Sequence, residues 1–332
     1  MSQAADTNTQ TTGAPETGLL SVVIPHWNAV RFLPTCLEAL HKQTYPHVEV
    51  IIADNNSTDG SKELVREQYP WVRLVELDRN YGFTGGCNAG IRAAKGEYIA
   101  LLNNDTEADP GWAAAVVDAF ARHSEAGSIA SKMLLFDRRD HIHAAGDFYT
   151  LDGLPGNRGV WQTDEGQFEQ EDYVFSACAG ASSYRRAMLD EIGLLDDDFF
   201  FSCEDVDLSW RAQFAGWRCL YTPRAIVYHH LSASGGGVTA SYYTGRNTIY
   251  VIAKNYPAEL WRKHGIAIIR AQAGIAWEAL RAWRGEAARA RLRGMFAGIR
   301  HIPRMMKKRR SIQGGRRVTL AYIESILAPI QR

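Results

Sequence analysis

Hydrophobic and polar positions alternate in blocks along the first third of the chain. Apolar runs of five to seven residues are followed by segments in which apolar side chains recur at helical spacing, such as Phe32, Leu33, Leu37 and Leu40. Continuous apolar runs are typical of strands buried on both faces, and strands that alternate with helices form parallel sheets. The pattern therefore predicts a parallel α/β sheet with right-handed crossovers. The expected strands cover residues 19–25, 48–53, 72–77 and 98–102, and the expected helices residues 32–40 and 61–68.

The rest of the chain is less regular. We expect a glycine-rich loop over residues 80–88, a short helix over 89–94, and hairpins and loops over 132–163. From Ser241 onward the pattern turns helical and basic. Further expected helices cover residues 111–122, 186–192 and 204–215, and further expected strands residues 175–184, 218–221 and 225–228.

The composition fits one sizeable domain with an appendage. The chain has 332 residues, of which 46% are hydrophobic, and this is enough for a full core. We expect a disordered lead (residues 1–18), an α/β domain (19–240) and a basic amphipathic helical region (241–332). The five cysteines lack the spacing of a zinc site, and no run reaches the ~20 apolar residues of a membrane span. These features predict a cytoplasmic protein with reduced thiols.

Charge is distributed unevenly along the chain. Basic and acidic residues number 37 each, yet the stretch from Arg262 to Arg332 holds 17 Lys and Arg against three Asp and Glu. Trp277, Leu280 and Trp283 recur among these arginines near helical spacing, which favours amphipathic helices on an anionic membrane surface. An ordinary solvated basic face is the alternative. We expect no nucleic-acid partner, because no recognition module accompanies the charge.

Oxygen-bearing side chains gather where two expected strands end. Asp54 and Asn55 follow one strand, and Asn103, Asn104 and Asp105 follow another. Open α/β sheets bind ligands at the carboxyl ends of their strands, and carboxylates suit Mg²⁺ or Mn²⁺. A polar turn that caps the next helix is the alternative interpretation of each segment.

Three carboxylates occur within four residues at Glu204, Asp205 and Asp207. They open an expected helix, so one or two of them could simply complement the positive end of its dipole. Crowded carboxylates also raise one another's pKa, a property that suits a general base. We expect Asp205 or Glu204 to take a proton from an incoming hydroxyl group.

A later expected strand ends at His229, just before a Ser/Gly-rich segment. A lone histidine beside an aromatic residue is more often structural, but a neutral imidazole here would complete a metal site built from Asp105. The glycines of residues 80–90 permit close approach of a ligand, although a flexible turn is their commoner role. If these interpretations hold, Asp105, Asp205 and His229 line one cavity.

Taken in order, these segments resemble the inverting glycosyltransferases of family two, which have the GT-A fold. Each motif is short, but the ordered set is specific, and it is most similar to bacterial rhamnosyltransferase-like members. The resemblance implies a Rossmann-like, mostly parallel sheet flanked by helices, with a C-terminal helical appendage. The matching motifs lie at residues 21–28, 54–60, 80–90, 103–105, 204–207 and 229–237.

The resemblance also implies roles for residues by position. Asp205 corresponds to the catalytic base, with Glu204 beside it. Asp105 and His229 correspond to ligands of Mg²⁺ or Mn²⁺, and Asn103 stands where the family has Asp. The donor-binding residues implied are Pro25, His26, Asn28, Asp54, Asn55, Gly82, Gly85, Asn88, Asn103, Asn104 and Arg246.

The implied function is transfer of a sugar, rhamnose or a similar one, from a nucleotide-diphosphate donor to a hydroxyl group. The acceptor would be a bacterial surface glycan or a polyprenyl-diphosphate-linked intermediate at the inner face of the plasma membrane. Such a single displacement needs a base and a divalent metal, but no protein nucleophile. Two alternatives stay open: a nucleotide-sugar binding module with a degenerate metal site, and a nucleotidyltransferase. The latter would need a glycine-rich basic loop, which residues 25–30 do not supply.

Overall fold

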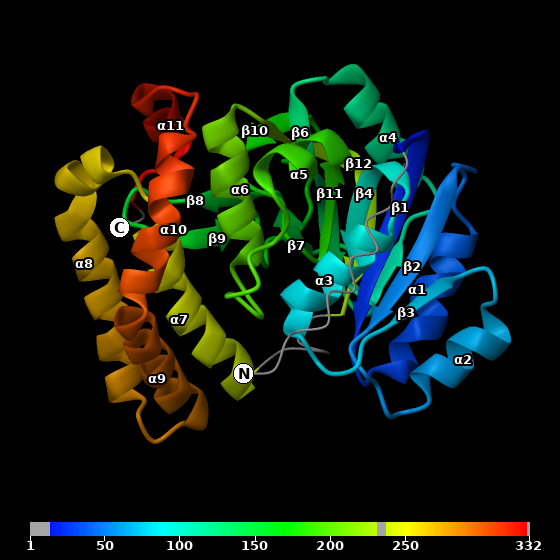
Figure 1. Cartoon of the computed structure of the whole chain (residues 1–332), viewed down its shortest axis with the longest axis horizontal. Helices are drawn as coiled ribbons and strands as arrows, with labels where there is room; N and C mark the ends of the chain where they lie inside the picture. Colours follow the sequence, from blue (N-terminus) through cyan, green and yellow to red (C-terminus); the bar gives the residue numbers. More distant parts are fainter. Residues whose placement is uncertain (1–13, 231–236, 331–332) are drawn as a thin grey trace.

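A computed structural model describes residues 14–230 and 237–330, and within them ten strands form one sheet. The strand order is β10-β12-β6-β11-β4-β1-β2-β3, with β5 beside β12, β7 beside β6, and β8 paired with β9 separately (Figure 1). The strands are β1 (Glu16–His26), β2 (Val48–Asp54), β3 (Arg73–Glu76), β4 (Gly96–Leu102), β5 (Thr106–Ala108), β6 (Ala126–Leu135), β7 (Ile142–Ala145), β8 (Asp147–Tyr149), β9 (Pro155–Asn157), β10 (Asp172–Val174), β11 (Ala181–Arg185) and β12 (Arg218–His229).

Helices cover both faces of this sheet and form a layer at one end of it (Figure 1). A short 3₁₀ helix, η1 (Val30–Phe32), precedes α1. The α-helices are α1 (Leu33–His41), α2 (Ser61–Gln68), α3 (Gly82–Ala93), α4 (Trp112–Arg122), α5 (Arg186–Ile192), α6 (Glu204–Ala215), α7 (Gly237–Asn255), α8 (Ala258–Arg281), α9 (Glu286–Arg300), α10 (Ile302–Gly314) and α11 (Leu320–Ile326).

The parallel half of the sheet contains the strands that the apolar runs predicted. β1 pairs in parallel with β2 and β4, and the pairing places His26 opposite Asp54, so their carboxyl ends share one edge. Alternate residues of β1 face opposite layers. Val22 packs in the core with residues of α1 and α4, whereas Val23 packs with residues of α3, α5 and α6. The predicted α/β fold class is therefore correct.

The expected glycine-rich loop over residues 80–88 is wrong from Gly82 onward, because α3 begins there. Its glycines serve close packing against the sheet. A Cβ atom on Gly90 would lie 2.2 Å from Val23 Cγ1, and one on Gly86 would lie 2.6 Å from Asn55 Nδ2. The helix can approach β1 this closely only without side chains at these positions.

Residues 126–135 form a fully buried strand, β6, although the apolar pattern predicted no strand there. The antiparallel strand β11 lies between β4 and β6, so the sheet is mixed beyond β4. The two expected strands at 218–221 and 225–228 are one strand, β12, whose register against β6 shifts between Thr222 and Ile226. Pro223 lies inside this shift, which explains the interruption of the apolar pattern.

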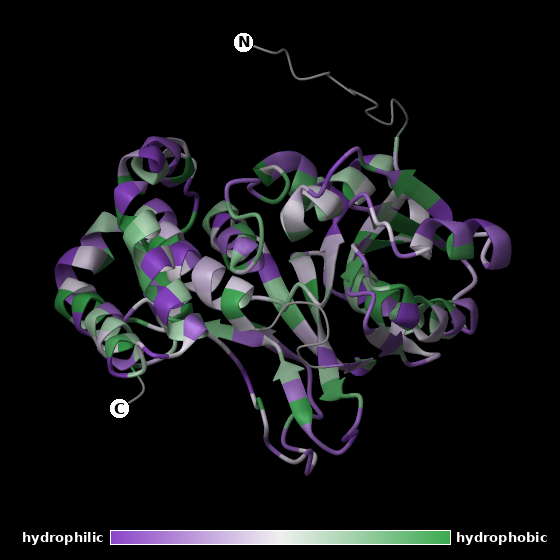
Figure 2. Cartoon of the chain, turned by 90° about the horizontal axis from the view of Figure 1, so that it is seen from below, coloured by the Kyte–Doolittle hydropathy of each residue, from purple (hydrophilic) through white to green (hydrophobic). Residues whose placement is uncertain are grey.

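The C-terminal helices α7 to α11 pack beside the sheet domain, on the left of Figures 1 and 2. One buried cluster contains Trp210 of α6 together with Tyr250, Ile268, Met305 and Ile323 from these helices. A common core therefore joins the two regions, and the boundary at residue 240 stays a prediction. Among the described residues, no helix is both long and apolar enough to cross a membrane.

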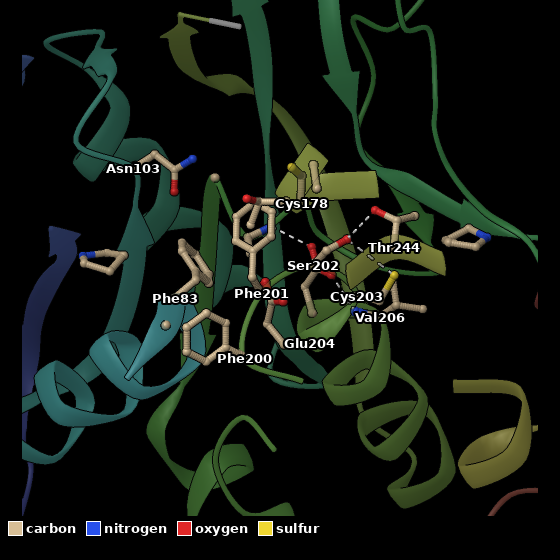
Figure 3. Close-up of a pocket in the computed structure, with 18 of the residues that line it drawn as sticks. Phe83, Asn103, Cys178, Phe200, Phe201, Ser202, Cys203, Glu204, Val206 and Thr244 are labelled. Carbon is tan, nitrogen blue, oxygen red and sulfur yellow. Dashed lines mark hydrogen bonds between the residues drawn. The ribbon is translucent and has the colours of Figure 1, made fainter. Parts of the chain in front are cut away.

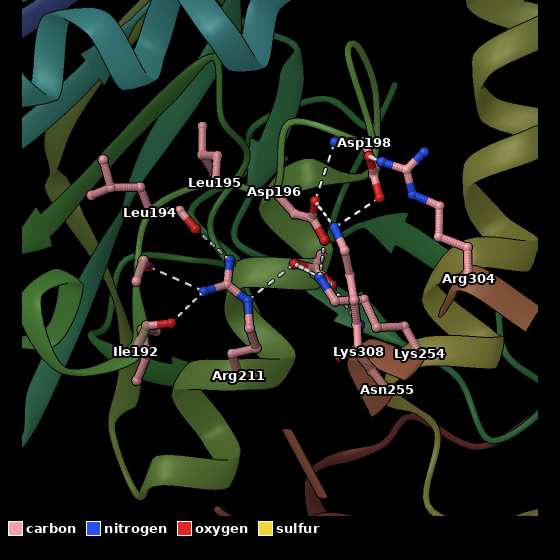
Figure 4. Close-up of polar contacts among 12 residues, drawn as sticks. Ile192, Leu194, Leu195, Asp196, Asp198, Arg211, Lys254, Asn255, Arg304 and Lys308 are labelled. Atoms are coloured by element: carbon pink, nitrogen blue, oxygen red, sulfur yellow. Dashed lines mark hydrogen bonds and ion pairs between the residues drawn. The ribbon is translucent and has the colours of Figure 1, made fainter. Parts of the chain in front are cut away.

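A buried charge cluster also fixes α7 to the helix that carries the expected base (Figure 4). Lys254 Nζ of α7 lies 2.5 Å from Asp196 Oδ2 and 2.7 Å from Asp207 Oδ1 of α6. Arg211 Nε donates to Asp207 Oδ2 at 3.0 Å, and Asn255 Nδ2 donates to Oδ1 at 2.8 Å. Burial opposes ionisation of Asp207, but Lys254 and Arg211 outweigh it and lower its pKa.

Candidate active site

A pocket of about 800 Å³ opens at the carboxyl ends of β1 and β4. Its walls combine residues predicted for the donor site with the carboxylates that open α6 (Figure 3). This is the position in which an open α/β sheet places its ligand site. The predicted residues that line it are Pro25, His26, Asn55, Gly82, Asn103, Asn104, Glu204 and Asp205.

The structure brings Asp105 and His229 together beside this pocket. β5 pairs with the end of β12, with Thr106 opposite His229, and His229 Nε2 lies 3.2 Å from Asp105 Oδ1. Both residues are buried, and neither lines the pocket. The expectation that they share one cavity with Asp205 is therefore wrong, because the pairing of β5 draws Asp105 into the sheet. Asn103 lies between the pocket and the Asp105–His229 pair. It lines the pocket, and its Nδ2 lies 3.4 Å from His229 Nε2.

The carboxylate of Asp205 is held by two backbone N–H groups inside the pocket. Ala179 N–H donates to Oδ2 at 2.9 Å, and Val206 N–H donates to Oδ1 at 2.7 Å. Burial raises the pKa of Asp205, while these two donors oppose the rise by favouring the charged form. Burial and the charge of Asp205 together raise the pKa of Glu204 well above its ordinary value. Of this pair, Asp205 is therefore the carboxyl group that loses its proton at the lower pH.

A further carboxylate faces Asp205 from a segment expected to form hairpins and loops. A carboxylate oxygen of Asp147 of β8, the Sγ of Cys178 and a carboxylate oxygen of Asp205 all lie within 4.8 Å of one another. Asn157 Nδ2 of β9 donates to Asp147 Oδ1 at 2.8 Å. Burial and the charge of Asp205 raise the pKa of Asp147 well above its ordinary value. The pocket thus places a carboxyl group with a strongly raised pKa beside Asp205.

The loop that leads into α6 has a strained backbone. Phe200, Ser202 and Cys203 have φ values of 62°, 71° and 65°, in the left-handed region that non-glycine residues rarely adopt. The buried Asn247 of α7 holds this loop through Nδ2, which donates to the carbonyl oxygens of Phe199 (3.0 Å), Phe201 (2.8 Å) and Ser202 (2.7 Å). The C-terminal helices therefore help to position Glu204 and Asp205.

The remaining predicted donor residues lie outside the pocket lining. Arg246 donates to the carbonyl oxygens of Asp198 and Phe199 at 2.8 and 2.7 Å, so its guanidinium supports the same loop. Asn88 is buried and its Nδ2 donates to Leu195 O at 2.9 Å. The side chains of Arg246 and Asn88 are thus engaged in the fold, and a role in donor binding stays a prediction for every predicted residue outside the lining. The residues concerned are Asn28, Asp54, Gly85, Asn88 and Arg246.

Several site residues were missed in the sequence. Trp27 lines the pocket with 54% of its surface exposed, and it directly follows His26. Asp147 and Asn157 reach the pocket only through the small sheet β8–β9, which has no clear pattern. His143 Nδ1 lies 3.1 Å from His229 Nδ1, with the rings stacked. Burial lowers the pKa of His143 to about 4, so its ring is neutral. The one available signal was a pair of histidines, His141 and His143, in alternate positions.

Comparison with known proteins identifies the family. A family model described as "Glycosyl transferase family 2" matches residues 21–193. The chain belongs to glycosyl transferase family 2. The N-acetylglucosaminyl-diphospho-decaprenol L-rhamnosyltransferase of Mycobacterium tuberculosis is 28% identical over 271 residues, which cover 74% of this chain and 87% of that protein. An O-antigen biosynthesis protein of Myxococcus xanthus is 30% identical over 225 residues, which cover 65% of this chain and 17% of that protein.

Solved structures confirm the fold expected for family 2. GalNAc-T7, solved with UDP, GalNAc and Mn²⁺, superposes with a TM-score of 0.56 at 18% identity, covering 71% of this chain and 48% of that one. A mannosyltransferase from Pyrobaculum calidifontis, solved with GDP-Man and Mn²⁺, gives 0.52 at 16% identity, covering 95% and 88%. The chain therefore has the GT-A type of α/β fold predicted from its motifs.

Proposed function

We propose that this family 2 glycosyltransferase is metal-dependent and inverting, and that it transfers rhamnose or a similar sugar from a nucleotide-diphosphate donor to a lipid-linked or surface-glycan hydroxyl group. The observation that carries the proposal is a series of contacts that links Asp205 in the pocket, the proposed base, to Asp105 and His229 beside it, the proposed metal ligands. Asp205 Oδ2 accepts from Ala179 N–H, the next residue's carbonyl accepts from Asn103 N–H at 3.0 Å, and Asn103 reaches His229. The relatives' names support the sugar and the acceptor class.

The Asp105–His229 pair fits a divalent cation. Metal–oxygen and metal–nitrogen bonds of roughly 2.0–2.2 Å meeting near a right angle place the two ligand atoms about 3 Å apart. The separation of 3.2 Å between His229 Nε2 and Asp105 Oδ1 matches this arrangement. Carboxylate and imidazole both suit Mn²⁺, and carboxylate suits Mg²⁺. When bound, such a cation would neutralise charge that develops on the leaving diphosphate. Asn103 lies against the pair and the pocket, so its amide would have to shift for a diphosphate to reach that cation.

The chain's own residues supply the remaining chemistry. Asp205 would remove the proton from the acceptor hydroxyl as its oxygen attacks the anomeric carbon, on the face opposite the departing diphosphate. The exposed ring of Trp27 at the pocket wall would stack on the nucleotide base. Asp147, which lines the pocket next to Asp205, would contact a second hydroxyl group of the acceptor, beside the one that attacks.

The first prediction concerns the donor. Thermal unfolding of the full chain should shift upward with one nucleotide-diphosphate sugar in the presence of Mn²⁺, because a ligand at 100 times its Kd adds about 2.7 kcal/mol to the free energy of unfolding. The same donor should be hydrolysed or transferred. Asp105→Asn should remove the Mn²⁺-dependent part of the shift. Stabilisation without any turnover would instead support a binding module, and no stabilisation by any donor would contradict the proposed function.

We also propose that the C-terminal helices dock on an anionic membrane surface. α8 lies at the outer edge of the molecule, and hydrophobic and hydrophilic residues alternate along the helices on the left of Figure 2. Ile266 and Trp277 of α8 are 69% and 62% exposed, and Phe296 of α9 is 70% exposed. Exposed arginines such as Arg270 and Arg281 accompany them. Apolar side chains that enter the interface, together with cations that meet lipid phosphates, fit a bilayer better than a second protein copy.

The second prediction tests this surface. Ile266→Glu combined with Trp277→Glu should weaken co-sedimentation with phosphatidylglycerol–phosphatidylcholine vesicles at least tenfold, because two apolar anchors are lost and two anionic charges are added. Trp161→Glu is the matched control, since Trp161 is 58% exposed in the sheet domain. Binding should also weaken as salt rises. Equal sedimentation of variant and wild type, or dimerisation through α8 in ultracentrifugation, would contradict membrane docking.

A further inference from the structure

The two ring nitrogens of His229 face different partners. Nε2 lies 3.2 Å from Asp105 Oδ1, and Nδ1 lies 3.1 Å from Nδ1 of His143 on β7. The two rings are stacked, with centroids 4.8 Å apart and planes inclined by 28°. β6 pairs with both β7 and β12, and its register against β7 shifts between Met133 and Leu134, opposite His143. The sheet itself therefore places the two histidines in contact.

A histidine binds a metal through a ring nitrogen that carries no proton, so the proton of a neutral ring must sit on the other nitrogen. For His229 to offer Nε2 to a cation shared with Asp105, Nδ1 must carry the proton and donate it to an acceptor. Among the described residues, the hydrogen-bond partner of His229 Nδ1 is His143 Nδ1. A neutral His143 protonated at Nε2 offers an unprotonated Nδ1 that can accept this hydrogen bond.

We infer that His143 is a positioning residue, which accepts the Nδ1–H of His229 and thereby presents Nε2 to the cation site. The inference rests on the proposed function, because it presumes that Asp105 and His229 hold a divalent cation. Metal-binding histidines depend on such partners for their tautomer and orientation, and loss of the partner typically weakens metal affinity about 10–100-fold. Here the acceptor is the neutral ring of His143, so the ring of His229 is oriented without a further negative charge beside Asp105.

The test measures Mn²⁺ binding to the full chain by electron paramagnetic resonance of the free ion. His143→Leu removes the acceptor and should weaken Mn²⁺ affinity about 10–100-fold. His143→Asn places an amide oxygen near the position of Nδ1 and should bind within a few-fold of wild type. His141→Leu is the matched control: this histidine lies two positions upstream, its Nδ1 lies 2.9 Å from Asp140 Oδ1, and its loss should leave Mn²⁺ affinity unchanged.

A second measurement reports the hydrogen bond directly. In the Co²⁺-loaded wild type, the imidazole N–H of a coordinated histidine should give a paramagnetically shifted proton signal that exchanges slowly with water. The signal should persist in His143→Asn and disappear in His143→Leu, where water reaches the N–H. If His143→Leu binds Mn²⁺ as wild type does, or if His143→Asn is as weak as His143→Leu, the role of His143 is overturned while the cation site stands. If wild type and Asp105→Asn both fail to bind Mn²⁺, the cation site and this inference are overturned together.

Discussion

Asp205→Asn is expected to reduce sugar transfer by a factor of about 10²–10⁴, the usual contribution of a positioned general base. The substitution preserves shape, and the Asn oxygen can still accept from Ala179 or Val206, so folding should be retained. Donor binding should not change, because the lost group acts on the acceptor proton. The measurement is the initial rate of transfer at saturating donor, with donor affinity from calorimetry.

Two controls separate the base from its neighbours. Glu204→Gln should have a small effect, because burial and the charge of Asp205 hold the pKa of Glu204 high and a glutamine mimics the protonated form. Asp190→Asn changes an exposed carboxylate on α5 and should have no effect. In the wild type, burial raises the pKa of Asp205, so the rate should fall as pH decreases through a value above the ~3.9 of an ordinary aspartate. Near-normal transfer by Asp205→Asn, together with a strong loss of transfer in Glu204→Gln, would show that Glu204 and not Asp205 is the base.

Lys254→Met is expected to lower the free energy of unfolding by about 3–5 kcal/mol. Lys254 is 2% exposed and pairs with Asp196 and with the completely buried Asp207. Methionine keeps the volume but leaves Asp207, among the described residues, with Arg211 and Asn255 as its side-chain partners, so a buried charge loses its main counterion. Arg211 should hold the effect toward the lower end of the range. Urea unfolding at neutral pH measures the loss.

The pH dependence of this variant supplies a second readout. Because the folded-state pKa of Asp207 is lowered, its ionised form stabilises the fold above the unfolded value of about 3.9, and this contribution is lost as pH falls through the folded value. The difference between Lys254→Met and wild type should therefore narrow in acid. Lys263→Met, which removes the pair of the exposed Lys263 with the half-buried Glu324, should leave the urea midpoint nearly unchanged. A similar urea midpoint for Lys254→Met and wild type would show that the buried charge cluster contributes little to the stability of the fold.

The sequence was most informative where function depends on short segments at strand ends. The runs at 19–25 and 98–102 fixed β1 and β4, because buried parallel strands must be continuously apolar. Helices α2, α5 and α6 lie where their patterns placed them. Three carboxylates in four residues directed attention to Glu204 and Asp205, the family resemblance favoured Asp205 as the base, and this role stays a prediction.

Only the tertiary structure decided which side chains meet. The pairing of β5 with β12 joins Asp105 to His229 and withdraws both from the pocket lining, and no local pattern encodes this pairing. His143, Asp147 and Asn157 reach the site from short strands whose residues carry no periodic signal. Arg246, which the resemblance implies as a donor-binding residue, supports the loop before α6 because α7 packs there, and its role in donor binding stays a prediction. Hydrophobic period and strand-end chemistry are local properties that a sequence carries by itself, whereas contacts between distant segments depend on register and packing.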